Sequence, residues 1–149
     1  RIIRIGTCGT GDKNIHLKDI IIGMGACTDS NCMAQYNLKG TYSAIASYPL
    51  LKESVDVAEK SGYPYCVGNI FSSDVFYDEY GIFDQYAEKF GVLAVEMEAY
   101  GLYVQAARVR KQALCLLSVT DHFATGERLT ADERQEGLRN MIEVALRLA

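Results

Sequence analysis

The sequence lacks the features that mark several large classes of protein. Its 149 residues contain no apolar run near the roughly 18 residues of a membrane-spanning helix, so we expect no membrane partner. Lys and Arg number 15 against 19 Asp and Glu, with no basic cluster, so we also expect no nucleic-acid partner. There are only two histidines, and neither has a second His or a Cys at metal-ligand spacing, so we expect no metal site.

The cysteines give no pattern of a disulfide framework. Their number, five, is odd, and no C-x-x-C pair occurs, which favours a reducing compartment and predicts a cytoplasmic protein. Cys66 and Cys115 lie in apolar runs and are expected to be small buried side chains. The residues alone leave a Cys nucleophile with a His base open, although nothing local favours it.

The composition is typical of a globular domain, with 49% hydrophobic and 23% charged residues and a net charge of -4. A chain of this length buries roughly 70% of its unfolded surface, which is enough for one core. The first five residues, Arg-Ile-Ile-Arg-Ile, form an apolar strand-like run without an initiator Met or a signal peptide. We therefore expect the chain to begin inside a fold.

Strand-like and helical patterns alternate along the chain. The apolar residues of the strand-like runs are nearly continuous, which is typical of strands covered on both faces. The helical runs include one that opens with the capping box Thr130-Ala-Asp-Glu133. This alternation predicts one α/β domain on a largely parallel or mixed sheet. The predicted strands are 1–6, 18–26, 65–70 and 112–120, and the predicted helices are 49–61, 83–90, 100–107 and 130–146.

A glycine-rich turn follows the first strand, in Arg4-Ile-Gly-Thr-Cys-Gly-Thr-Gly11. Glycines allow backbone N–H groups to converge on an anion, the Thr7 hydroxyl can donate, and Arg4 can neutralise charge. No G-K-[ST] follows, and no helix opens after it, so the turn is neither a P-loop nor a dinucleotide fingerprint. An ordinary turn remains the alternative.

Two further motifs place carboxylates near element ends. In Val95-Glu-Met-Glu98, both carboxylates can interact favourably with the dipole of the following helix. The apolar residues before them favour instead a site out of water, where sugar hydroxyls would donate hydrogen bonds to a carboxylate. In Ser118-Val-Thr-Asp-His122, Asp121 follows an apolar strand, where ligands bind in open α/β sheets. The alternative is an Asp that caps a turn, and His122 is expected to be structural.

Taken in order, these segments resemble the bacterial-type, hexameric purine nucleoside phosphorylases of the nucleoside phosphorylase-I family. The resemblance covers the whole chain. It implies a three-layer α/β sandwich around a central mixed, mostly parallel β-sheet. It also implies that residues 1–149 are the C-terminal portion of a single domain whose N-terminal part, with a further phosphate loop, is missing. The matching pieces are Arg4-Ile-Gly-Thr-Cys-Gly9, Ile22-Gly-Met-Gly-Ala-Cys-Thr-Asp-Ser30, Val67-Gly-Asn-Ile-Phe-Ser-Ser-Asp-Val-Phe-Tyr77, Val95-Glu-Met-Glu-Ala99, Ser118-Val-Thr-Asp-His122 and Thr130-Ala-Asp-Glu-Arg-Gln135.

The activity implied is cleavage of a purine nucleoside by phosphate into free base and ribose 1-phosphate. Phosphate is then a co-substrate, no cofactor is needed, and the partners are purine nucleosides, phosphate and further copies in a homohexamer. Thr7 and Thr120 stand where the family commonly has Ser, and both keep the hydroxyl. By resemblance, phosphate contacts Arg4, Ile5, Gly6 and Thr7, the nucleoside contacts Phe76, Val95, Glu96, Met97, Glu98, Thr120 and Asp121, and catalysis uses Asp121 and Arg134.

Asp121 would act as the general acid toward purine N7, because a purine anion is a poor leaving group. It must then hold a proton near neutral pH, which an adjacent guanidinium opposes. We therefore hypothesise that Arg134 stays away from Asp121 in the open site and moves in on closure.

Other functions remain open on the sequence. A related nucleosidase would replace phosphate with water, and an inactive fragment would bind nucleoside without turnover. A nicotinamide-cofactor enzyme lacks its fingerprint here.

Overall fold

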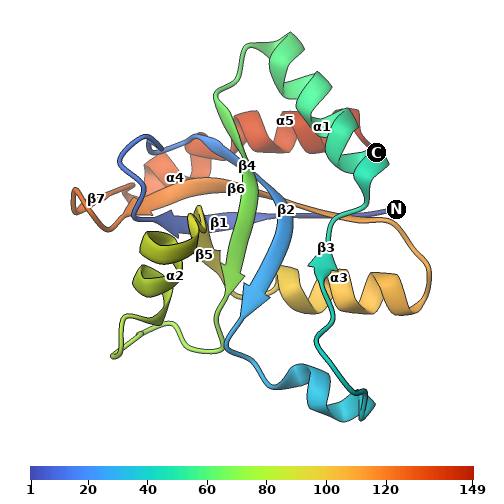
Figure 1. Ribbon diagram of the computed structural model, residues 1–149. Helices are drawn as coiled ribbons and strands as arrows, with labels where there is room; N and C mark the ends of the chain where they lie inside the picture. Colours follow the sequence, from blue (N-terminus) through green and yellow to red (C-terminus); the bar gives the residue numbers. More distant parts are fainter.

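The predicted strand runs form a mixed sheet in the computed structural model of the chain (Figure 1). The structure describes residues 1–149, apart from the side chain of Glu136. All four predicted strand runs are confirmed, and each strand ends two to four residues later than predicted. The glycine-rich turn predicted over residues 4–11 is therefore wrong, because β1 continues to Thr10. The described strands are β1 (Ile2–Thr10), β2 (Ile20–Thr28), β3 (Ala44–Ile45), β4 (Tyr65–Ser72), β5 (Ala94–Glu96), β6 (Ala113–His122) and β7 (Glu127–Arg128).

Helices cover the sheet on both sides, giving three layers. In Figure 1, α1 and α5 lie together above β1 and β6, and α3 crosses below them. None of the helices in the described part of the chain has the length and apolarity needed to cross a membrane. The helices are η1 (Cys32–Tyr36, 3-10), α1 (Tyr48–Ser61), α2 (Ile82–Phe90), α3 (Ala99–Arg108), α4 (Ala131–Gly137) and α5 (Arg139–Arg147).

The strand order is β3-β2-β4-β5-β1-β6-β7. The two longest ladders, β1 with β6 and β2 with β4, are parallel, as expected of a mixed, mostly parallel sheet. The sheet also curls back on itself, because Ile20–Gly23 of β2 pairs antiparallel with residues 115–118 of β6. This closure was not predicted, and it brings the ends of β1, β4, β5 and β6 around one hollow.

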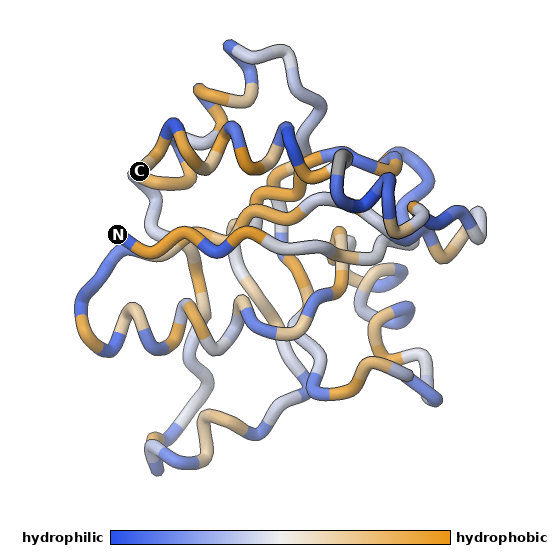
Figure 2. The backbone as a smooth tube through the Cα atoms, turned by 180° about the vertical axis from the view of Figure 1, so that it is seen from behind, coloured by the Kyte–Doolittle hydropathy of each residue, from blue (hydrophilic) through white to orange (hydrophobic). Residues whose placement is uncertain are grey.

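The core follows the continuous apolar runs. Residues 113–120 of β6 are all buried, and so are Ile20, Ile21 and Ile22 of β2. Figure 2 shows apolar residues along these strands and along the inward faces of the helices, with polar residues in the loops. Burial of such runs on both faces is the main source of stability in a domain of this type.

A single tyrosine hydrogen-bonds to both strands, β2 and β6, at the point where the sheet closes. The Tyr103 hydroxyl of α3 donates to the Gly23 carbonyl at 2.5 Å and accepts from the Cys115 N–H at 3.0 Å. Both backbone groups lie at the end of the β2–β6 ladder. Burial raises the pKa of this hydroxyl, so it stays protonated and can donate.

Replacing Tyr103 by Phe should lower the free energy of unfolding by about 1–3 kcal/mol, because a buried N–H and a buried C=O lose their partner. Urea unfolding followed by circular dichroism measures this change. Tyr48→Phe is the matched control, since Tyr48 is 71% exposed, and it should change stability by less than about 0.5 kcal/mol. Equal stabilities for the two variants would show that the hydroxyl contributes nothing to the closure.

The C-terminal helix differs from the prediction. The capping box is confirmed: the Thr130 N–H donates to Glu133 at 2.9 Å, and the bonds from Thr130 lower the pKa of the Glu133 carboxyl. The single predicted helix is wrong, because α4 ends at Gly137 and α5 begins at Arg139. Glycine is a poor helix former, and the Ser118 hydroxyl binds the Gly137 carbonyl at 3.3 Å.

The prediction that Cys66 and Cys115 are buried is confirmed for Cys115 alone. Cys115 is fully buried, and its pKa is raised to about 12 by burial, whereas Cys66 is only half-buried. The exposed residues of β4 are Val67 and Asn69, and Cys66 lies on the opposite face, which becomes fully covered only from Ile70 onward.

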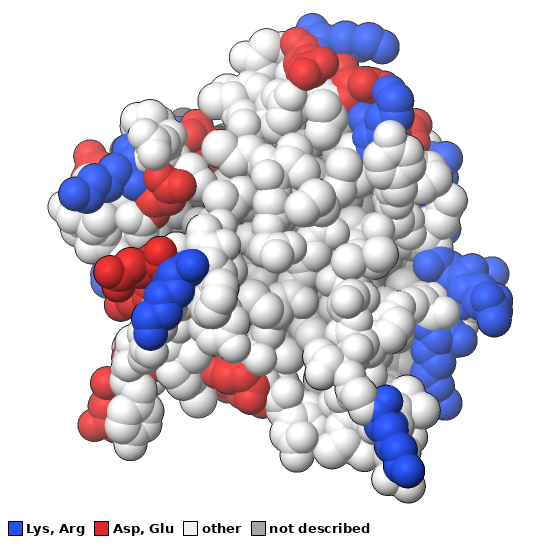
Figure 3. Space-filling model, in the orientation of Figure 1, with Lys and Arg blue, Asp and Glu red and all other residues white. Residues whose placement is uncertain are grey.

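One face of the molecule is nearly free of charge. Figure 3 shows Lys, Arg, Asp and Glu at its rim and uncharged residues across its middle, over β2 and β4. Exposed apolar side chains on this part of the sheet are Met24, Ile45 and Val67.

Candidate functional site

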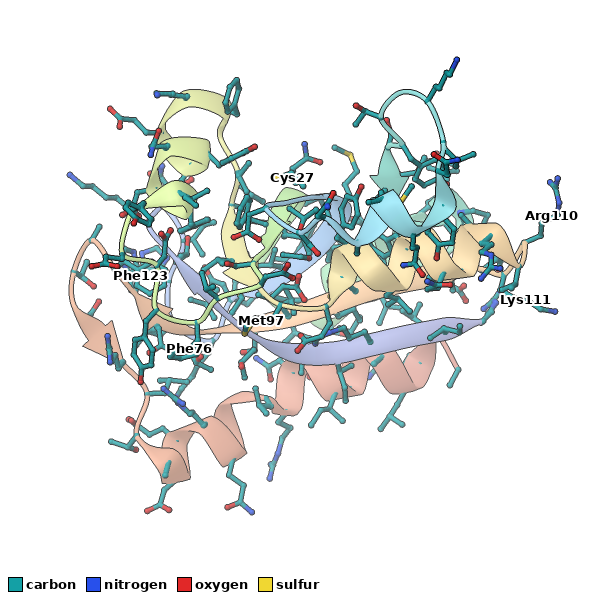
Figure 4. The ribbon with its side chains drawn as sticks, turned by 90° about the horizontal axis from the view of Figure 1, so that it is seen from below. Cys27, Phe76, Met97, Arg110, Lys111 and Phe123 are labelled. Atoms are coloured by element: carbon teal, nitrogen blue, oxygen red, sulfur yellow. The ribbon has the colours of Figure 1, made fainter. Side chains whose placement is uncertain are left out.

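A cavity of about 410 Å³ opens where β1, β4, β5 and β6 end. It gathers most of the residues predicted for the site from separate segments of the chain. Figure 4 shows Phe76, Met97 and Phe123 at this end of the molecule, with Arg110 and Lys111 at the opposite end. The lining residues are Arg4, Thr7, Cys8, Gly9, Ser73, Val75, Phe76, Tyr77, Val95, Glu96, Met97, Glu98, Thr120, Asp121, Phe123 and Arg128.

Three predicted residues do not line this cavity. Ile5 and Gly6 are part of β1 beside Arg4, and the Ile5 carbonyl accepts a bond from the Arg4 guanidinium at 3.4 Å. A side chain at position 6 would collide with the same guanidinium, which would then have to move. Arg134 approaches Asp121 without forming part of the lining.

Arg4 is held by two carboxylates. Its Nη2 forms an ion pair with Glu98 and lies 3.5 Å from Oε2 of Glu96. The Arg4 side chain is 21% exposed and that of Glu98 is 58% exposed, so this pair can exchange with a ligand in the cavity. The predicted phosphate arginine and the predicted ribose carboxylate therefore contact each other directly.

Glu96 has a different environment from Glu98. It is buried, and its carboxylate accepts bonds from the Ser72 hydroxyl and from the backbone N–H groups of Glu98 and Ala99, each N–H at 2.9 Å from Oε2. Burial raises the pKa of the Glu96 carboxyl, against the lowering effect of these bonds and of Arg4. Glu96 thus satisfies the start of α3, as the helix-dipole alternative predicts, while it also forms part of the cavity wall.

Asp121 lies within a cluster of donors. The Thr120 hydroxyl donates to Oδ2 at 2.8 Å, and Nη2 of Arg134 lies 3.3 Å from both carboxylate oxygens. Nε of Arg128 lies 3.5 Å from Oδ1. Every hydrogen bond from the described residues to this carboxylate comes from a side chain, so Asp121 does not act as a turn cap.

In this structure Arg134 already lies beside Asp121, which is the arrangement that the hypothesis gives to the closed site. The segment after β6 turns at Gly126, where φ is 75°, and β7 pairs back on β6 with Asp121 opposite Arg128. This hairpin brings the start of α4 beside Asp121, and opposite charges then attract across 3.3 Å. Sequence reasoning had no measure of this distance.

His122 is structural, as expected. It is buried, its Nδ1 accepts the Thr125 N–H at 3.3 Å, and its Nε2 therefore donates to the Asp12 carbonyl at 3.1 Å. Both ring nitrogens are occupied, so neither serves as a base in the cavity.

Aromatic rings form one wall of the cavity. Phe76 and Tyr77 are largely exposed and pack edge to face, with ring centroids 5.1 Å apart. Phe123 packs on the backbone of Gly9, where any side chain would overlap its ring, and against Phe83 at 5.9 Å. Sequence reasoning identified Phe76 but missed Tyr77, which lies within a motif that carries the resemblance, and Phe123, which directly follows one.

Nucleophilic thiol chemistry has no support in this cavity. Cys8 is buried in the cavity wall, and burial raises its pKa well above the ordinary value, so the thiol is neutral at pH 7. Among residues with described side chains, no three His, Cys, Asp or Glu come together as a metal-ligand set.

Comparison with known proteins identifies relatives of this arrangement. The family model described as "Phosphorylase superfamily" matches residues 1–149. The DeoD-type purine nucleoside phosphorylase of Psychromonas ingrahamii is 50% identical over 147 residues, which cover 97% of this chain and 61% of that protein. The DeoD-type purine nucleoside phosphorylase of Colwellia psychrerythraea is 48% identical over 146 residues, which cover 98% of this chain and 62% of that protein.

A solved structure shows the same fold. The purine nucleoside phosphorylase of Toxoplasma gondii, crystallised in complex with immucillin-H, superposes with a TM-score of 0.83 at 20% identity, covering 99% of this chain and 61% of that one. The chain thus spans about 61% of the length of the relatives it matches. The α/β sandwich expected from the resemblance is confirmed, and the chain belongs to the phosphorylase superfamily.

Proposed function

We propose that the protein cleaves purine ribonucleosides and deoxyribonucleosides with phosphate, giving free purine and (deoxy)ribose 1-phosphate. The observation that carries this proposal is the joint placement of Arg4, Thr7, Glu98 and Asp121 on one cavity, in a chain related to DeoD-type phosphorylases. A cation and a hydroxyl suit phosphate, and a carboxyl suits a leaving purine.

Phosphate would bind at the Arg4 end of the cavity. Arg4 presents several N–H donors, and Thr7 adds a hydroxyl from the same strand, beside the backbone of Ile5 and Gly6. Phosphate would share or displace the exposed Glu98 on the guanidinium. Glu98 is then available to accept bonds from the ribose hydroxyls, so binding of the two substrates is coupled.

The nucleoside would lie between Met97 and the aromatic wall. Met97 packs on the sugar, and Phe76, Val95, Glu96 and Thr120 border the base. As phosphate oxygen attacks C1′, the glycosidic bond breaks, its electron pair moves onto the purine, and N7 takes a proton from Asp121. For Asp121 to hold that proton beforehand, the Arg134 contact at 3.3 Å has to open when the nucleoside binds, and its return then stabilises the carboxylate that is left.

We further propose that the chain is the C-terminal portion of a single nucleoside phosphorylase domain that acts as a homohexamer in the cytoplasm. The uncharged face over β2 and β4 supports assembly with further copies (Figure 3). Phosphate is then a co-substrate, and the reaction needs no resident cofactor.

Release of hypoxanthine from inosine should require phosphate, because phosphate is the attacking group. The assay compares base release and ribose 1-phosphate formation in phosphate and in sulfate at equal ionic strength. Equal release in both buffers would identify a nucleosidase instead. Inosine binding without release in either buffer would identify an inactive nucleoside-binding fragment.

A further inference from the structure

Arg128 is a cavity residue without a role in the reaction described above. It belongs to β7, where it is the register partner of Asp121, and its side chain lines the cavity. Its Nε lies 3.5 Å from Oδ1 of Asp121, and the side chain is 71% exposed. Among the described residues, none accepts a hydrogen bond from the terminal nitrogens of this guanidinium, which borders the cavity.

Arg128 and Arg134 approach the same carboxylate from different directions. Arg134 comes from α4 and is not part of the cavity lining, so its contact with Asp121 is made from outside. Arg128 comes from the hairpin and faces the cavity. A ligand atom that contacts Asp121 therefore has the donors of Arg128 beside it.

The purine edge next to N7 carries the substituent at C6. In 6-oxopurines this group is an acceptor, and in 6-aminopurines it is a donor. Arginine has only N–H donors and no acceptor. An arginine beside the N7 contact is therefore matched to a 6-oxo group and mismatched to a 6-amino group, as in the pairing of arginine with O6 and N7 of guanine.

We propose that Arg128 donates a hydrogen bond to the C6 oxygen of the substrate and makes this site select 6-oxopurine nucleosides over 6-aminopurine nucleosides. The inference rests on the proposed function, since it takes Asp121 as the N7 contact. Arg128 is a specificity-determining residue in this scheme, and Asp121 remains the proton donor.

The test compares inosine with adenosine on the protein and its Arg128 variants. Arg128→Met keeps much of the aliphatic stem and removes every donor, and Arg128→Gln offers both a donor and an acceptor. Titration calorimetry gives the Kd of each nucleoside, and the phosphate-dependent assay gives kcat/KM. Lys111→Gln is the charge-matched control, at the opposite end of the molecule (Figure 4).

The protein should prefer inosine, and R128M should weaken inosine binding about tenfold or more while adenosine changes less than about twofold. R128Q should bring the two nucleosides close to equal affinity, and K111Q should leave both values unchanged. An unchanged inosine to adenosine ratio in R128M would overturn the inference, and so would equal losses for both nucleosides.

The two proposals fail in distinguishable ways. Nucleoside cleavage that requires phosphate but is insensitive to Arg128 overturns the specificity inference alone. Nucleoside cleavage without phosphate overturns phosphorolysis, while an inosine preference that depends on Arg128 would still support the inference. Absence of binding for both nucleosides overturns both proposals.

Discussion

Replacing Asp121 by Asn should lower kcat for inosine about 10²- to 10⁴-fold, the usual contribution of a general acid. The amide has nearly the same shape and keeps an oxygen that can accept from Thr120 and Arg134. It has no proton to transfer to N7. Phosphorolysis followed by hypoxanthine release measures the loss, and thermal unfolding checks that the fold is retained.

A substrate with a charged purine separates proton transfer from binding. In 7-methylinosine, N7 already carries the positive charge, so the leaving base needs no proton. D121N should therefore cleave it within about tenfold of the rate of the unsubstituted protein. Asp56→Asn is a matched control, because Asp56 is a carboxylate in an exposed ion pair with Lys52 at 2.8 Å. This variant should cleave both substrates at the rate of the unsubstituted protein. Equal losses for inosine and 7-methylinosine would mean that Asp121 only positions the base.

Replacing Arg4 by Gln should raise the KM for phosphate roughly tenfold to a hundredfold, because charge-assisted bonds to the anion are lost. The KM for phosphate of Arg4→Lys should lie between those of R4Q and the unsubstituted protein, since lysine keeps the charge but lacks the planar fork of donors. Initial rates at varied phosphate and saturating inosine measure this effect.

Glu98→Gln gives the complementary variant. It removes the nearer of the two carboxylates that hold Arg4 without removing the cation, so the KM for phosphate should stay the same or fall, while inosine binds more weakly. An R4Q protein with an unchanged KM for phosphate would place the anion elsewhere in the cavity. The pair of variants thus separates a phosphate role for Arg4 from a general disturbance of the site.

The long strands of this fold are readable from the sequence because their apolar runs are continuous. The runs at 1–6, 18–26, 65–70 and 112–120 correspond to β1, β2, β4 and β6. The remaining strands, β3, β5 and β7, have two or three residues each, which is too short to give a pattern. Their pairing is decided by tertiary contacts, such as the return of β7 onto β6.

The site was predictable where its residues lie in dense motifs at strand ends. Glu98 and Asp121 line the cavity, as their positions after or at the ends of strands suggested, whereas Thr7 lines it from within β1 and not from the predicted turn. Arg128 was missed because nothing in the local sequence distinguishes it from a solvated arginine. Its place depends on the register of the hairpin, which puts it opposite Asp121.

The pairing of β1 with β6 sets the order in which this site can form. Arg4 lies opposite Cys115, and the ladder runs from Ile2 with Ala113 to Thr10 with His122. The strand that carries Arg4 therefore waits for a parallel partner made more than a hundred residues later, and the β2–β6 pairing waits for the same strand. Contacts of such sequence separation slow folding, since a long loop must close before they form. During synthesis, the pairing of β1 and β2 with β6 waits until that strand emerges from the ribosome, so a chain released before residue 113 lacks the strand that joins them, and Asp121 with it.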